Sequence, residues 1–169
     1  ERCFETISPW INSVLLPNNP KFAPIIDQEL TEVDYGSWSG RKLAVLSRNK
    51  MWKIVQESPS RMYFPGGEGI AQMQSRAMKS IHEAVSSKAK GSVVIVSHGD
   101  VIKSIVASAL GMHLDEFQRI VIDPASISIL DFSTTKPRTL LLNDSRSVVT
   151  ELLVAPKRSK NLLGGGAGR

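Results

Sequence analysis

The stretch GSVVIVSHGDVIKSIVASALG, residues 91–111, decides the fold. Residues 93–96 form an unbroken apolar run, which is typical of a strand covered on both faces. After a turn at His98 and Gly99, apolar residues recur at three- and four-residue spacing, which predicts an amphipathic helix; they are Val101, Ile102, Ile105, Val106, Ala109 and Leu110. A buried strand that turns sharply into a helix is typical of α/β proteins.

The rest of the chain supports this prediction. Helices are expected up to about Leu16, over 43–47, over 52–56, and from about Ile70, where Met73, Ala77, Ile81, Ala84 and Val85 share its apolar face. Pro9 must start or kink the first helix, because it lacks an N–H group. Strands are expected at 24–30, 119–123, 126–132 and 138–143. This order predicts an α/β sheet with helices on its faces.

The composition is that of a globular protein without an obvious membrane segment. The 169 residues fit one domain, which we place at 1–150, followed by a basic, Gly-rich tail at 151–169. The net charge of +5 lies mostly in this tail, so we expect a solvated surface and no nucleic-acid partner. No apolar run approaches the ~20 residues that cross a bilayer. The single Cys3 fits a reducing, cytoplasmic compartment, and no cysteine–histidine spacing suggests a metal.

His98 is the first candidate site residue. Ligands of open α/β sheets bind beyond the carboxyl ends of the strands, and a helix that starts there offers unpaired N–H groups to an anion. Gly99 lets the backbone approach a ligand closely, and Asp100 is a candidate helix cap. The alternative, that His98 only satisfies hydrogen bonds of the turn, stays open at this point.

Two further segments carry candidate residues. FPGGEG, residues 64–69, places Glu68 at a helix start, where an acidic residue is also favoured for purely structural reasons. ERCFETIS, residues 1–8, holds Arg2, which matches an anion, and Thr6 four residues later on the same helical face. A lone N-terminal arginine is more often just a surface residue.

Four segments together resemble the histidine phosphatase superfamily, the phosphoglycerate mutase-like proteins. ERCFET is similar to the end of its S-P-L-x-R-x-x-x-T motif, and DYGSWSG to its D-x-G-x-W-x-G segment. FPGGEG resembles its P-G-G-E-S loop, with Gly69 in place of the serine, and VVIVSHGDVIK resembles its second-histidine strand. The resemblance implies a three-layer α/β sandwich with a mostly parallel sheet and helices on both faces.

The resemblance also implies chemistry. In this family one histidine attacks phosphorus and carries the phosphoryl group, a second histidine and two arginines bind it, and a carboxylic acid protonates the leaving oxygen. Carried over, His98 is the second histidine, Arg2 a phosphate-binding arginine and Glu68 the proton donor, with Thr6 and Gly99 beside the phosphate. The implied substrate is a small phosphorylated metabolite, no cofactor or metal is required, and a homo-oligomer is possible.

One family motif has no counterpart. The chain contains no R-H-G, the motif that holds the nucleophilic histidine. We therefore expect an N-terminally truncated member, with the first strand or strands missing and no activity of its own. His82 and His113 are expected at the surface rather than as substitutes. A phosphatase is favoured over a mutase because the loop from Gly40 to Pro65 is short; a mutase and a non-catalytic phosphate-binding or interaction module remain as alternatives.

Overall fold

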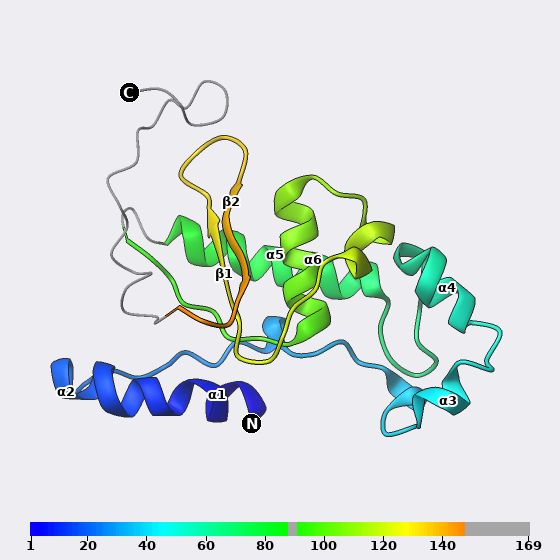
Figure 1. The fold of residues 1–169 in the computed structure, drawn as a ribbon, viewed down its shortest axis with the longest axis horizontal. Helices are drawn as coiled ribbons and strands as arrows, with labels where there is room; N and C mark the ends of the chain where they lie inside the picture. Colours follow the sequence, from blue (N-terminus) through cyan, green and yellow to red (C-terminus); the bar gives the residue numbers. More distant parts are fainter. Residues whose placement is uncertain (88–90, 148–169) are drawn as a thin grey trace.

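The computed structural model describes residues 1–87 and 91–147 and places helices around a small sheet (Figure 1). The α-helices are α1 (Arg2–Trp10), α2 (Leu16–Asn18), α3 (Leu43–Leu46), α4 (Trp52–Glu57), α5 (Ile70–Ser86) and α6 (Gly99–Leu110). The π-helix η1 spans Ile11–Leu15, and the short 3₁₀ segments are η2 (Gln28–Leu30), η3 (Gly36–Trp38), η4 (Pro59–Arg61) and η5 (Leu114–Arg119). The strands are β1 (Ile127–Asp131) and β2 (Arg138–Asp144).

The core lies around α5 and α6, two helices whose apolar faces the sequence predicts. Their buried residues include Met73 and Ala77 from α5 and Val101, Ile105 and Val106 from α6. The expected faces are therefore largely confirmed, although Leu110 is exposed. Gly111 ends α6 in the left-handed conformation, with a φ of +67°, which glycine adopts without a steric penalty.

The sheet differs from the expected one. Within the described residues it has two strands, β1 and β2, which pair antiparallel with Ile129 opposite Leu141 and Asp131 opposite Arg138. The predictions of strands at 126–132 and 138–143 are confirmed, but no parallel pair occurs among the residues that the structure places. A helical molecule with a small sheet is therefore what the structure supports.

Three other predicted strands are wrong. Residues 24–30 are extended only as far as Asp27 and then form η2, because the Asp27 carboxylate accepts the N–H of Glu29 and starts the turn. Residues 119–123 begin inside η5 and continue without pairing. Residues 93–96 are extended but have no neighbouring strand in the described chain, and Val93 and Val94 are exposed rather than covered on both faces.

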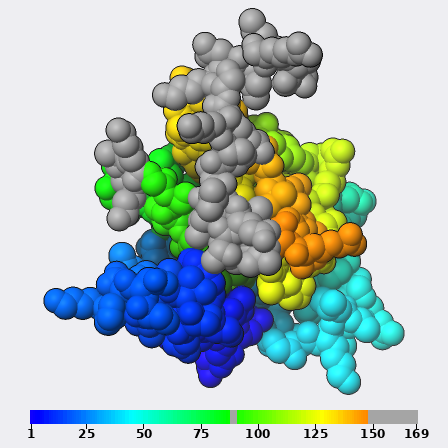
Figure 2. Space-filling model, turned by 60° about the vertical axis from the view of Figure 1, so that its left-hand side comes forward, coloured from blue at the N-terminus to red at the C-terminus, as the bar shows by residue number. Residues whose placement is uncertain are grey.

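The N-terminal helix forms a layer beside this core. Helix α1 contains Pro9 and passes directly into the π-helix η1 and then α2, so the chain is helical to Asn18 with its irregularity next to the proline. Figure 2 shows this segment, in blue, along one side of the molecule. The predicted domain end at 150 and the basic tail at 151–169 lie outside the described residues.

In the described part of the chain no helix combines the length and the apolar character needed to cross a bilayer.

Candidate functional site

His98 is the N-cap of α6. Its φ of −105° and ψ of 163° are extended, so the chain turns into the helix directly behind its side chain. Among residues 1–87 and 91–147 no side chain caps α6, so its first N–H groups have no capping partner there and can serve a ligand. The prediction that Asp100 caps the helix is wrong, since its carboxylate instead accepts the hydroxyl of Tyr35 and lies near Lys103.

The imidazole of His98 lies among side chains from two other segments. Nη2 of Arg2 is 3.5 Å from Nδ1, and Sγ of Cys3 is 3.4 Å from Nε2. An oxygen of Glu32 is 3.8 Å from Nδ1, at the outer limit of an ion pair. Burial and the neighbouring Arg2 charge lower the pKa of His98, which favours the neutral ring.

The structure places His98 and Arg2, which the resemblance assigns to one phosphate site, within 3.5 Å of each other. Thr6 lies one turn further along α1, where its hydroxyl donates to the carbonyl of Arg2. Gly99 is the first residue of α6, and a Cβ built there would meet no protein atom within 4 Å. Open space therefore lies beside Gly99, next to the free N–H groups of the helix.

Glu68 is held in a different network. Arg76 of α5 donates from Nε to Oε2 at 3.0 Å and from Nη2 to Oε1 at 2.6 Å, and the N–H of Asp34 donates to Oε1 at 2.9 Å. Burial alone would raise the pKa of Glu68, but the hydrogen bonds from Arg76 and Asp34 outweigh burial and hold it below its usual value. A proton donor was expected to have a raised pKa, so this environment does not supply that property.

Glu32 is a site residue that the sequence reasoning missed. It lies in the segment between η2 and η3. Burial raises the pKa of its carboxyl, and the charge of Asp100 adds a smaller increase. The N–H of Val33, which donates to this carboxyl, lowers the pKa by less than burial raises it. Its main-chain carbonyl accepts Nη2 of Arg76 at 3.2 Å, which fixes the segment. The sequence offers one indication that Glu32 is partly buried: this carboxylate lies between the apolar residues Leu30 and Val33, two residues before Asp34 of the DYGSWSG segment.

The Glu32 segment is locked to the Glu68 loop by close backbone contact. The N–H of Ser37 donates to the carbonyl of Pro65, and the N–H of Glu68 donates to that of Asp34. A Cβ on Gly36 would overlap the Pro65 carbonyl oxygen, and one on Gly67 would overlap that of Asp34. Both glycines are therefore required by the close approach of the two loops.

The remaining histidines lie elsewhere, as expected. His82 is exposed on α5 and packs edge-on against Phe132, and His113 is exposed and starts η5 by accepting the N–H of Asp115. In the ranges 1–87 and 91–147 no three histidine, cysteine or acidic side chains gather as they would around a metal ion.

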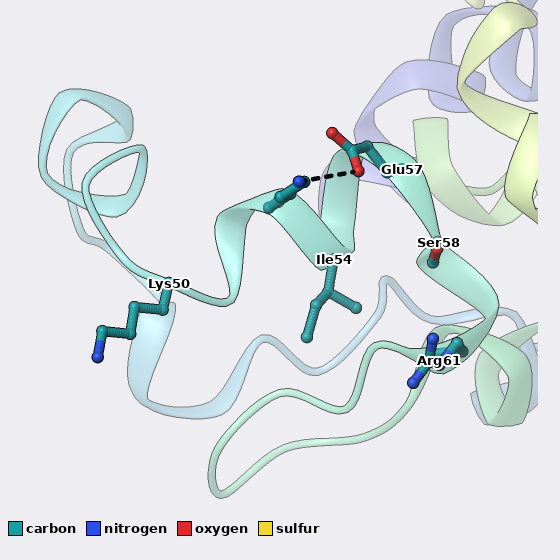
Figure 3. Close-up of a pocket in the computed structure, with 6 residues that line it drawn as sticks. Lys50, Ile54, Glu57, Ser58 and Arg61 are labelled. Carbon is teal, nitrogen blue, oxygen red and sulfur yellow. Dashed lines mark ion pairs between the residues drawn. The ribbon is translucent and has the colours of Figure 1, made fainter.

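A separate pocket lies on the surface of α4 and η4 (Figure 3). Lys53 pairs there with Glu57 across 3.7 Å, and Figure 3 shows Lys50 and Arg61 further apart on either side of this pair. The residues that line this pocket do not include His98, Arg2 or Glu32, so we assign the candidate site to the start of α6 and not to this depression.

The family assignment follows from the sequence as a whole. The model of the histidine phosphatase superfamily (branch 1) matches residues 1–145, which is most of the chain. The chain belongs to the histidine phosphatase superfamily. Its segments around Arg2, Glu32, Glu68 and His98 all lie within the matched range.

Curated proteins with phosphatase and mutase names are similar to the chain in sequence. Phosphoserine phosphatase 1 of Hydrogenobacter thermophilus is 28% identical over 125 residues, which cover 70% of this chain and 57% of that protein. The probable phosphoglycerate mutase GpmB of Erwinia tasmaniensis is 28% identical over 109 residues, 63% of this chain and 51% of its own. The chain thus spans about half the length of these relatives.

Solved structures of other proteins have a similar fold. Bacillus stearothermophilus YhfR has a TM-score of 0.69 at 18% identity, covering 85% of this chain and 81% of its own. A mycobacterial glucosyl-3-phosphoglycerate phosphatase in complex with VO3 has a TM-score of 0.66 at 21% identity, covering 80% and 71%. The fold is therefore the α/β fold of this superfamily, of which the described residues hold the helices and a small sheet.

Proposed function

We propose that this chain carries the phosphate-binding part of a phosphomonoesterase that acts through a phosphohistidine. Arg2 and His98 bind the phosphoryl group, together with the N–H groups at the start of α6. A carboxylic acid beside His98 protonates the leaving oxygen. The substrate is a small phosphate monoester, in keeping with relatives that are named phosphoserine phosphatase and acid phosphatase.

The contact between Arg2 and His98 carries this proposal. A guanidinium nitrogen faces an imidazole nitrogen across 3.5 Å at the N-terminus of a twelve-residue helix. An anion placed there would accept hydrogen bonds from Arg2 and from the helix N–H groups, and would favour protonation of the ring. Such an arrangement also stabilises the charge that spreads over the phosphoryl oxygens in the transition state.

A phosphohistidine mechanism requires an attacking histidine, and the R-H-G motif that holds it in the family does not occur in these 169 residues. Two extended segments, 23–26 and 92–97, make no main-chain hydrogen bonds to the described residues. Residues 95–97 are half-buried, so their main-chain groups require a pairing partner, whereas residues 23–26 are exposed. We assign this place to a strand that brings the nucleophile next to His98, and the chain alone should not turn over.

Glu32 is the carboxyl group that best fits the proton donor. A donor must be protonated before transfer, and the pKa of Glu32 is raised while that of Glu68 is lowered. Glu32 also lies 3.8 Å from His98, whereas both oxygens of Glu68 are taken by Arg76. Glu68 remains the second candidate, because a bound phosphate adds negative charge that raises the pKa of a nearby carboxyl.

The absence of R-H-G favours one other function, a non-catalytic phosphate-binding module. A phosphoglycerate mutase is less well supported, because the segment between Gly40 and Pro65 holds only the short helices α3 and α4 and the turn η4. Hydrolysis of an aryl phosphate by any longer form of the protein distinguishes the phosphatase from the non-catalytic module. The phosphatase requires turnover that is lost in His98→Ala, whereas the module requires none.

The binding proposal is tested on the chain as it stands by calorimetric titration with inorganic phosphate. Binding should be lost or weakened at least tenfold in Arg2→Gln and His98→Gln, because each removes a hydrogen bond to a charged group. His113→Gln is the matched control, since His113 is exposed on a different element. Equal affinity in all four proteins would refute the proposal.

A further inference from the structure

We propose that residues 41–61, which hold α3, α4 and η4, form a surface that docks on bilayers rich in anionic lipid. This inference goes beyond the proposed function and does not depend on phosphate binding at His98. It is carried by two features that coincide in this segment: a dense set of exposed basic residues, and large apolar side chains that are exposed beside them.

The segment is strongly basic. It contains six basic residues and one acidic residue, so its net charge of +5 equals that of the whole chain. All six basic residues are exposed: Arg41, Lys42, Arg48, Lys50, Lys53 and Arg61. The acid, Glu57, pairs with Lys53 across 3.7 Å, and among residues 1–87 and 91–147 the other basic side chains of the segment form no ion pair. Their charges therefore add up to a positive surface that attracts anions.

Large apolar side chains are exposed in the same segment. Leu43 and Val45 of α3 are 70% and 57% exposed, and Ile54 of α4 is 38% exposed. Both helices are nevertheless anchored in the protein, because Leu46 of α3 and Val55 of α4 are buried in the main core. The segment thus presents apolar groups to solvent from elements that the core holds in place.

Basic and apolar side chains meet in the depression of Figure 3. It has a volume of about 240 Å³, and its lining includes Lys50, Lys53, Ile54 and Arg61. Figure 3 shows Ile54 with Lys50 on one side and Arg61 on the other. Figure 1 places α3 and α4 together at one end of the molecule, away from the sheet. A flat, extended partner can therefore reach this end of the protein.

An anionic bilayer matches both features of the segment. Lysine and arginine are attracted to acidic headgroups, and apolar side chains beside them enter the boundary between headgroups and acyl chains. A single-stranded nucleic acid would instead require aromatic side chains on which bases stack. The one aromatic residue of the segment, Trp52, is stacked on Trp38, with ring centroids 6.3 Å apart. The exposed apolar groups are aliphatic, which favours lipid.

The test is flotation of the whole chain with vesicles of phosphatidylcholine, alone or mixed with about one third phosphatidylserine. The chain should float only with the mixed vesicles, and added salt should release it. Lys50→Gln and Arg61→Gln should each weaken binding about fivefold, because each removes one attraction to the headgroups. Leu43→Ser should also weaken it about fivefold, although it changes no charge.

Two control variants test the location of the surface. Lys136→Gln removes an exposed lysine from the turn between β1 and β2, and it should leave binding unchanged. A triple variant, Lys157→Gln with Arg158→Gln and Lys160→Gln, removes charge from the basic tail and should have a smaller effect than Lys50→Gln with Arg61→Gln. A larger effect of the tail variant would overturn the assignment to residues 41–61.

Two further results would overturn the proposal. The first is a chain that does not float with the mixed vesicles. The second is binding that falls in the charge variants but is the same in Leu43→Ser and the wild type, which would assign the surface to a soluble anionic partner such as RNA or an acidic protein. Phosphate titration of the same variants should be unchanged, so a failure here leaves the proposed function intact.

Discussion

Arg76 donates hydrogen bonds to both carboxylate oxygens of Glu68, and the same guanidinium donates to the main-chain carbonyl oxygens of Glu29 and Glu32. One side chain of α5 thus fixes both the glycine-rich loop before it and the segment that carries Glu32 toward His98. The side chains of Arg76 and Glu68 are only 18% and 19% exposed, so removing one partner should destabilise the fold more than breaking a surface ion pair does.

Arg76→Gln should lower the free energy of unfolding by about 2–4 kcal/mol at neutral pH, because it leaves a half-buried carboxylate without its partner. Urea denaturation measures this directly. The control is Lys53→Gln, which breaks the exposed pair with Glu57 and should change stability by less than about 1 kcal/mol. Similar losses in the two variants would contradict the special weight given to Arg76.

The same pair predicts a pH dependence. The pKa of Glu68 is lower in the folded chain than in the unfolded one, so its contribution is complete above the unfolded value of about 4.3 and is lost as the pH falls through the folded value. The stability difference between wild type and Arg76→Gln should therefore shrink below about pH 4. A difference that stays constant down to about pH 2 would contradict the role assigned to the pair.

Gly36 and Gly40 offer a matched test of the loop contact. Both have positive φ, +51° and +73°, but a Cβ would overlap the Pro65 carbonyl only at Gly36, and nothing lies within 4 Å at Gly40. Gly40→Ala should lower stability by about 1 kcal/mol through backbone strain alone. Gly36→Ala should lower it by more than about 3 kcal/mol. Equal losses in thermal or urea unfolding would show that the loops do not need their close approach.

Glu32→Gln and Glu68→Gln should separate the two candidate acids in any form of the protein that turns over. A missing proton donor slows esters of poor leaving groups far more than activated phenol esters, which leave without a proton. In a series of aryl and alkyl phosphates, Glu32→Gln should reduce the hydrolysis rate by about 10²-fold for the esters with the poorest leaving groups and much less for activated phenol esters. Glu68→Gln should slow the series evenly; the reverse pattern would return the role to Glu68.

Val93 and Val94 are 42% and 47% exposed on an extended segment without a paired neighbour in the described chain. Such edges pair with other chains, so we expect self-association at micromolar concentration. Val93→Lys should reduce it, since a charge on an edge opposes pairing. Sedimentation velocity measures both proteins, and a wild type that stays monomeric would contradict the expectation.

The sequence predicts the helices of this fold better than its sheet. The periodicity around Met73 and Val101 identifies α5 and α6 because a helix pairs its own main-chain groups and only its buried face needs a partner. A strand needs a neighbour to pair with, which local composition does not reveal. Residues 93–96 have the composition of a strand but no neighbouring strand in the described chain. The predicted strand at 24–30 ends at Asp27, whose side chain starts the turn η2.

The candidate site was predictable in part for a similar reason. The position of His98 before a helix follows from local pattern, and the family resemblance placed Arg2 beside it. The partners of Glu68 did not follow, because Arg76 lies eight residues away on a helix whose orientation only the fold sets. Glu32 was missed because its raised pKa arises from burial and from Asp100, which is 68 residues further along the chain.

The most direct test of phosphate binding at Arg2 and His98 is the titration of the His98 imidazole by ¹H–¹⁵N NMR, with and without inorganic phosphate. Without phosphate, burial and Arg2 lower the pKa of His98, so the ring should be neutral at pH 7. A bound anion favours the charged ring, so phosphate should raise this pKa and binding should take up protons near neutral pH. In Arg2→Gln the phosphate-dependent shift should be lost or need much higher phosphate. A His98 pKa that is the same with and without phosphate would contradict phosphate binding at Arg2 and His98.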